Sequence, residues 1–165
     1  MFILDSRVMS TGNSPQINLE PIRTPCIGVC STGIGDSVCR GCKRFSHEVI
    51  DWNGYTQEEK RFVDKRLSGF LSQACALKCT VTDRELLKWQ LDTQQVRYAA
   101  DHDEYCWLFQ LLRAGAGQIK DASKYGFRVH GDWVDLTLLQ LRDQIDEDFW
   151  VLSTAHYDRY LATPD

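Results

Sequence analysis

Four cysteines close together near the front of the chain constrain its fold more than any other feature. They are Cys26, Cys30, Cys39 and Cys42, spaced as C-x3-C-x8-C-x2-C. Two close cysteine pairs joined by a short loop can turn four sulfurs toward one point, as in proteins that hold a zinc ion or an iron–sulfur cluster. We therefore predict that these four side chains bind one metal centre together.

The spacing of the cysteines favours zinc over an iron–sulfur cluster. Pairs with two or three intervening residues suit tetrahedral zinc, and the common iron–sulfur spacings differ from this one. Arg40 and Arg44 lie beside the ligands and would offset the negative charge of either site. Trp52 follows the last cysteine on a predicted short helix, and we expect it to pack beside the site and limit access of water.

The residues that follow the cysteines carry a family resemblance. From about residue 25 to residue 71 the chain resembles DUF1289, a family of small bacterial proteins described as predicted iron–sulfur proteins. Where that family often has glycine after the fourth cysteine, this chain has Lys43. The resemblance implies an iron–sulfur cluster but no activity, and it places the cluster slightly ahead of zinc. The matching residues are Pro25, Cys26, Ile27, Cys30, Cys39, Arg40, Gly41, Cys42, Arg44, Glu48, Ile50, Trp52, Glu59 and Lys60.

A second thiol pair, Cys75 and Cys79, repeats the C-x3-C spacing. Residues four apart on a helix lie on one face, so the two sulfurs could join a second site or bind an ion. No further pair of ligands lies nearby in the sequence, which favours ordinary helix residues. We keep the pair as a secondary candidate.

The chain divides into three predicted parts. Residues 1–23 are polar and without a period, which predicts a flexible arm. Residues 24–80 form the cysteine-rich metal-binding module, and residues 81–165 form a helical C-terminal region. Helical periods and capping signals predict a mostly α fold, in which the metal knuckle is followed by a small helical bundle. The predicted helices lie at 46–52, at 56 to about 76, after Thr82, from Asp101 to 115–117, and in one or two pieces after Asp135, with a short strand or loop between 118 and 134.

Charge and compartment set the expected partners. Residues 1–80 carry ten Lys/Arg against eight Asp/Glu, and residues 81–165 carry nine against fifteen. The acidic C-terminal region therefore opposes a nucleic-acid track along the whole chain. The N-terminal segment has too short an apolar run for a signal peptide, and Met9 is an alternative start. We expect a reducing cytoplasm, where seven cysteines are ligands or buried thiols, not disulfides.

Three functions remain open from the sequence. The first is a non-catalytic cytosolic metal-binding accessory protein, whose C-terminal helical region docks a protein and exposes some of its many aromatic rings. The second is an iron–sulfur protein for electron transfer or oxidant sensing. The third is a zinc module that binds nucleic acid through its basic helix after Thr56. Enzyme signals are nearly absent, because the glycine pairs lack the context of a phosphate loop and no nucleophile motif occurs.

Overall fold

The computed structural model describes residues 20–164, so most of the predicted arm at 1–23 lies outside the described residues. The described part is mostly helical, which confirms the mostly α part of the predicted fold. A small antiparallel sheet and several 3-10 turns connect the helices. The elements are α1 (Ser46–Asp51), α2 (Gln57–Ala76), β1 (Cys79–Val81), α3 (Arg84–Thr93), α4 (Glu104–Gly115), β2 (Phe127–Val129) and α5 (Leu138–Tyr160).

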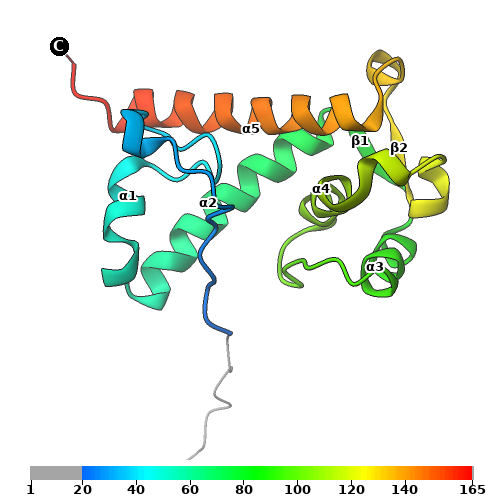
Figure 1. Ribbon diagram of the computed structural model, residues 1–165, viewed down its shortest axis with the longest axis horizontal. Coiled ribbons are helices and arrows are strands. Elements are labelled where there is room, and N and C mark those ends of the chain that lie inside the picture. The colour runs from blue at the N-terminus through cyan, green and yellow to red at the C-terminus, as the bar shows by residue number, and fades with distance from the viewer. Residues whose placement is uncertain (1–19, 165) are drawn as a thin grey trace, which may run out of the picture.

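Helix α2 runs diagonally through the centre of the fold (Figure 1). It begins at the predicted capping box, in which Thr56 accepts from the N–H of Glu59 and the Glu59 carboxylate accepts from the N–H of Thr56. Its buried side chains recur at helical spacing along one face, and this face packs against α4 and α5. They are Val63, Leu67, Leu71, Ala74 and Cys75.

Helix α5 crosses the top of the molecule as one continuous helix (Figure 1). A capping box between Thr137 and Gln140 starts it. Leu141, Ile145 and Phe149 follow at intervals of four and are buried, so one stripe of the helix faces the core. Because α5 is long, its first half covers the sheet and α4 side while its second half reaches the cysteine segment.

The two strands join segments far apart in the sequence. Cys79 pairs with Val129 and Val81 pairs with Phe127 in an antiparallel register. Gly126 precedes β2 at φ +79, and a Cβ there would lie 2.3 Å from the carbonyl oxygen of Asp83. Of the short strand or loop expected between residues 118 and 134, the strand is present as β2. Cys79 lies on β1, so the prediction that it is a helix residue is wrong.

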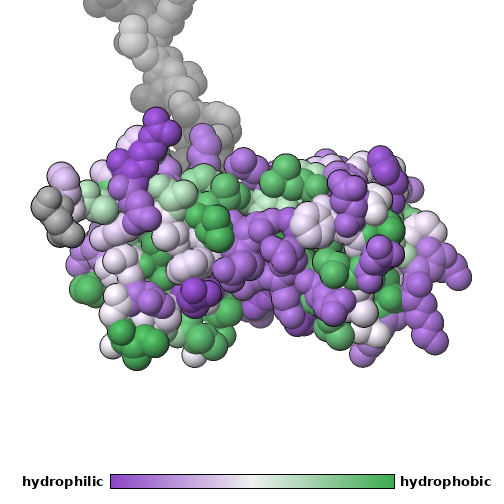
Figure 2. Space-filling model, turned by 90° about the horizontal axis from the view of Figure 1, so that it is seen from above, coloured by the Kyte–Doolittle hydropathy of each residue, from purple (hydrophilic) through white to green (hydrophobic). Residues whose placement is uncertain are grey.

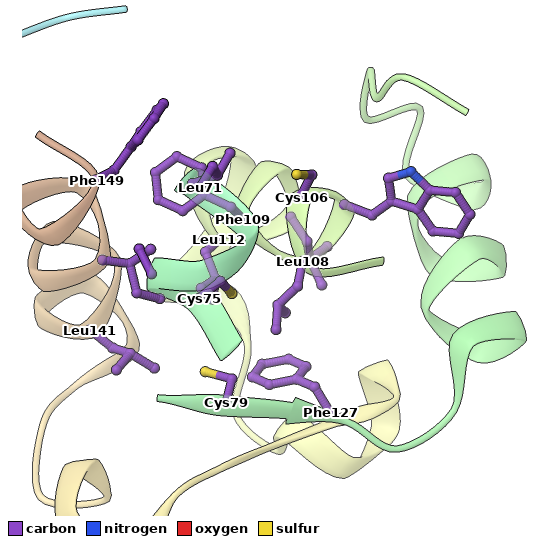
Figure 3. Close-up of a cluster of buried hydrophobic side chains, with 14 of the residues drawn as sticks. Leu71, Cys75, Cys79, Cys106, Leu108, Phe109, Leu112, Phe127, Leu141 and Phe149 are labelled. Atoms are coloured by element: carbon purple, nitrogen blue, oxygen red, sulfur yellow. The ribbon is translucent and has the colours of Figure 1, made fainter. Parts of the chain in front are cut away.

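The core lies between α2, α4, α5 and the sheet (Figure 3). Trp107 and Phe127 are almost fully buried there, and so are Cys75, Cys79 and Cys106. The caps of two helices differ from the predicted ones, because the carboxylate of Asp83 caps α3 in place of Thr82, and that of Asp103 caps α4 in place of Asp101.

Candidate metal centre

The second cysteine pair is built on a tight turn. The N–H of Cys39 donates to the carbonyl of Arg44 at 2.9 Å, and the N–H of Lys43 donates to the carbonyl of Cys39 at 2.8 Å. Lys43 has φ 64, the left-handed conformation that glycine adopts at little cost. The turn that glycine would favour therefore forms with lysine in its place. It buries both cysteines, which are 0% and 6% exposed.

Lys43 compensates for this conformation through its side chain. It is only 1% exposed, and its Nζ donates to the carbonyl of Gly41 at 3.1 Å and to the Asp146 carboxylate at 2.5 Å. A left-handed backbone costs a non-glycine residue about 1–2 kcal/mol. The pairing with Asp146 offsets this cost and anchors the turn to the middle of α5.

Arg44 connects the turn to the Trp52 ring. Its guanidinium is buried, its Nε donates to the Cys42 sulfur at 3.3 Å, and it lies 4.8 Å from the Trp52 ring centre. Trp52 is itself 5% exposed, and its ring packs against the arginine that contacts Cys42. Ile50, at the end of α1, is 79% exposed.

Arg40 binds the turn to α5 at a second point. Its guanidinium stacks on the Trp150 ring at 3.8 Å and pairs with Glu147 at 3.6 Å, and the Trp150 indole donates to the carbonyl of Val38 at 3.3 Å. Figure 2 looks down on α5 and shows hydrophilic residues gathered across the middle of the molecule.

The acidic run 146–148 lies in the middle of α5, away from both of its ends. Asp146 pairs with Lys43, Glu147 with Arg40, and Asp148 with the buried Lys78. These pairs therefore join the C-terminal helix to the cysteine-rich module across the predicted boundary at residue 80.

The first cysteine pair is exposed. The N–H of Gly28 donates to the Cys26 sulfur at 3.4 Å, and the Cys30 sulfur lies 3.1 Å from the Thr32 hydroxyl. Both cysteines lie at the surface, with Ile27 and Val29 exposed between them. Gly28 has φ +89, which lets the short segment reverse.

The two pairs meet through backbone. A Cβ atom on Gly41 would lie 2.2 Å from the carbonyl oxygen of Val29, and the Cys39 thiol donates to the same oxygen at 3.6 Å. The N–H of Arg40 also donates to the Ser31 hydroxyl at 2.8 Å. The loop that carries the first pair thus lies directly against the turn that carries the second.

The backbone segments of the two pairs are in contact, but their four sulfurs do not form one group. Among residues 20–164, no group of three or more His, Cys, Asp or Glu side chains is placed to hold a metal ion. The structure brings Cys39 and Cys42 together and sets their segment against that of Cys26 and Cys30. The four-cysteine centre stays a prediction.

The chemistry of the donor set fits a thiophilic metal. Burial raises the pKa of Cys39, but backbone N–H groups of Cys42, Ser31 and Gly41 outweigh burial and lower it to about 7. Burial raises the pKa of Cys42, and Arg44 opposes this. N–H donors directed at sulfur stabilise thiolates, which are the form that binds metal.

The secondary pair lies in the hydrophobic core (Figure 3). A hydrogen bond between the two thiols raises the pKa of Cys75, with burial adding to it, and the same bond lowers the pKa of Cys79 against burial. Burial also raises the pKa of Cys106, whose thiol donates to the carbonyl of Ser68 at 3.2 Å. The surroundings of these thiols are those of buried core residues.

The basic helix predicted for nucleic acid is α2, and part of its charge is used internally. Arg66 forms two hydrogen bonds to the buried Glu48 carboxylate, at 2.5 and 2.8 Å, and stacks on Phe45 at 3.9 Å. Lys60 lies 5.5 Å from the Trp52 ring centre. Lys60, Arg61 and Lys65 are the cations of this helix for which the described residues show no ion pair.

Sequence reasoning missed the contribution of α5. Asp146, Glu147 and Trp150 lie more than a hundred residues after the turn they hold, and no local pattern links them to it. Lys43 carried a usable signal, because a long cation at a position that favours glycine suggests a side chain with a structural partner.

Comparison with known proteins gives one result for the site. Neither the curated proteins nor the solved structures include a match. None of the helices within residues 20–164 is long and apolar enough to cross a membrane. Residues 24–70 match the model of the family DUF1289, described as a protein of unknown function, and this confirms the predicted resemblance of the cysteine segment and α2 to that family.

Proposed function

We propose that the protein is a non-catalytic metal-binding accessory protein with one centre held by Cys26, Cys30, Cys39 and Cys42. The observation that carries the proposal is the contact between the two cysteine segments, in which Gly41 leaves room for the carbonyl of Val29. A side chain at position 41 would separate the two pairs. The packing supports a site that needs both.

The proposed group is an iron–sulfur cluster, with a structural zinc ion as the alternative. A cluster would supply a one-electron redox couple, and zinc would supply folding energy. In either case the Cys39–Arg44 turn holds two ligands, and Arg44 donates to the Cys42 sulfur. Arg40 and Lys43 lie beside the site and are each paired with an acid of α5, Glu147 and Asp146.

We call the protein accessory because we expect it to bind another protein. We place the docking surface for that partner on residues 81–165. The candidate anchor is Trp89 on α3, which is 59% exposed, and aromatic side chains are typical anchors of protein interfaces. Tyr160 is also exposed but lies at the end of α5, at the opposite end of the molecule from α3 (Figure 1). Trp107 is buried and belongs to the core.

The second candidate function is electron transfer or oxidant sensing. The exposure of Cys26 and Cys30 favours it, because an electron carrier or a sensor must have one edge of its centre within reach of a partner or an oxidant. The two candidates share the centre and differ in whether its redox state changes in use.

One purification tests the proposal. Full-length protein purified without oxygen should contain iron and sulfide with visible absorption, or zinc with none, at one centre per chain. The Cys42→Ser variant should lose the metal, and the Cys106→Ser variant, altered at a core thiol away from the site, should keep it. Wild-type protein without bound metal would overturn the proposal.

A further inference from the structure

We propose that the four-cysteine centre is divided into a permanent half, Cys39 and Cys42, and an exchangeable half, Cys26 and Cys30, at which an incoming thiolate takes the place of a protein ligand. This inference rests on the proposed function. It adds the order in which the ligands engage, and it assigns metal uptake and release to one face of the protein.

The permanent half is held from several sides by contacts within the protein. Its turn is closed by two backbone hydrogen bonds between Cys39 and the segment Lys43–Arg44. Lys43 ties the turn to Asp146, and Arg44 donates to the Cys42 sulfur. These contacts would keep both sulfurs in place while other ligands exchange.

The sulfurs of the exchangeable half have few such restraints, whereas the backbone between them contacts the turn at Val29. The Cys26 sulfur accepts only from the N–H of Gly28 among the described residues, and the partner of Cys30 is the nearby Thr32. Both partners lie two residues from the cysteine they contact, so neither fixes the segment to the rest of the fold. The side chains beside the thiols are partly exposed to solvent, Ile27 by 46% and Val29 by 62%.

The exchange step is a ligand substitution without redox change. An incoming thiol loses its proton and forms one metal–sulfur bond, while one bond from Cys26 or Cys30 breaks and the released thiolate takes up a proton. Metal, charge and electron count are conserved, and the exchange would begin and end with four sulfur ligands. Cys39 and Cys42 hold the metal during the substitution.

Cobalt(II) titration of the full chain measures the two halves separately, because thiolate-to-cobalt absorption reports sulfur ligands. We compare wild type with Cys26→Ser/Cys30→Ser and Cys39→Ser/Cys42→Ser. We expect the first double variant to bind at least tenfold more weakly than wild type but to keep a thiolate band, and the second to lose it. Equal or stronger binding by the second variant overturns the inference. Wild type that binds no metal overturns the proposed function instead.

A second measurement does not depend on replacing the buried cysteines. Native mass spectrometry of the Cys26→Ser/Cys30→Ser variant with zinc should detect a complex in which added thiolates fill the two vacant positions. The added ligands are glutathione and, separately, a peptide with a Cys-x-x-Cys pair. A complex with glutathione shows that a small thiol can be the incoming ligand. A complex that forms with the peptide but not with glutathione shows that the incoming ligand is a thiol pair of a protein. If zinc binds in both mixtures but the complex carries no added thiolate, the inference is overturned. It is also overturned if no zinc binds in either mixture.

Discussion

The carbonyl oxygen of Val29 lies 2.2 Å from the position that a Cβ atom on Gly41 would occupy. Gly41 lies between Cys39 and Cys42, and Val29 lies between Cys26 and Cys30, so this contact is where the two cysteine pairs meet. No heavy atoms normally approach a Cβ so closely, and the backbone carbonyl cannot rotate away as a side chain would. The contact makes glycine a requirement of the paired arrangement.

Gly41→Ala should therefore push the two segments apart. We expect a loss of about 1–3 kcal/mol in the free energy of unfolding, typical of overpacking, and a lower metal content. Gly33→Ala is the matched control, because a Cβ there meets nothing within 4 Å. Thermal unfolding and metal analysis check both variants. Equal metal content in the two would contradict the role of this contact.

Arg44→Met should speed metal release without unfolding the protein. The substitution keeps apolar contact with Trp52 but removes the N–H that Arg44 directs at the Cys42 sulfur. Loss of a hydrogen bond to a metal ligand typically lowers metal affinity by about 10–100-fold. Release to a chelator measures the effect, with exposed Arg97→Met as the control. Identical release rates for the two variants would argue against an influence of Arg44 on the ligand.

Asp146→Ala should destabilise the protein more than Asp143→Ala. Asp146 is the carboxylate partner of the Lys43 ammonium, which is 1% exposed, whereas Asp143 pairs with Arg142 at the surface. Leaving a buried charge without its partner costs about 1–3 kcal/mol, and a surface pair contributes about 0–1 kcal/mol. Urea unfolding of both variants checks this. A smaller loss for Asp146→Ala would show that the turn does not depend on α5.

The stability of the protein should depend on pH through His102. Its Nε2 lies 2.8 Å from the Asp64 carboxylate on α2, and this hydrogen bond raises the pKa of His102 above 6.5 against the effect of burial. Asp101 and Asp103 add to the raised pKa. Because the folded pKa exceeds the unfolded one, this stabilisation is complete below the unfolded pKa and disappears as pH rises through the folded pKa.

The His102→Gln variant isolates this contribution. Its free energy of unfolding should be lower than that of wild type at acidic pH, and the difference should shrink as pH increases above about 6.5. Urea unfolding at a series of pH values measures the difference, which cancels groups that titrate in both proteins. A difference that stays constant with pH would contradict the assigned pKa shift.

Replacing Cys75 with Ala should affect the core and leave the metal centre intact. Cys75 is fully buried and hydrogen-bonded to Cys79, so its loss should lower stability by about 1–3 kcal/mol. Metal content per chain should equal that of wild type. A proportional loss of metal would instead assign the pair Cys75 and Cys79 to a metal site.

Local signals were sufficient for most helices. The capping box at Thr56 and the helical period after it predicted α2, and the four cysteines stood out by spacing alone. Strand β1 was missed because three residues carry no period, and its partner Phe127–Val129 lies almost fifty residues later. Such a strand is defined by its pairing.

The contacts around the candidate site were unpredictable for the same reason. A run of acids such as 146–148 is usually solvated, and only the packing of α5 across the cysteine turn gives it three cationic partners. Likewise, Lys43 in a left-handed turn becomes understandable once its buried ammonium is seen beside Asp146. Ion pairs between residues far apart in the sequence determine these conformations, and the local sequence alone does not distinguish them from the alternatives.

X-ray absorption at the edge of the bound metal tests the central claim most directly, because it identifies the element and counts its nearest ligands. For protein purified without oxygen, the account predicts a first shell made only of sulfur, at about 2.3 Å for zinc. Four protein thiolates should contribute, and the signal should be lost in Cys39→Ser/Cys42→Ser. A first shell of nitrogen and oxygen, or sulfur ligation that survives this double replacement, would contradict the account.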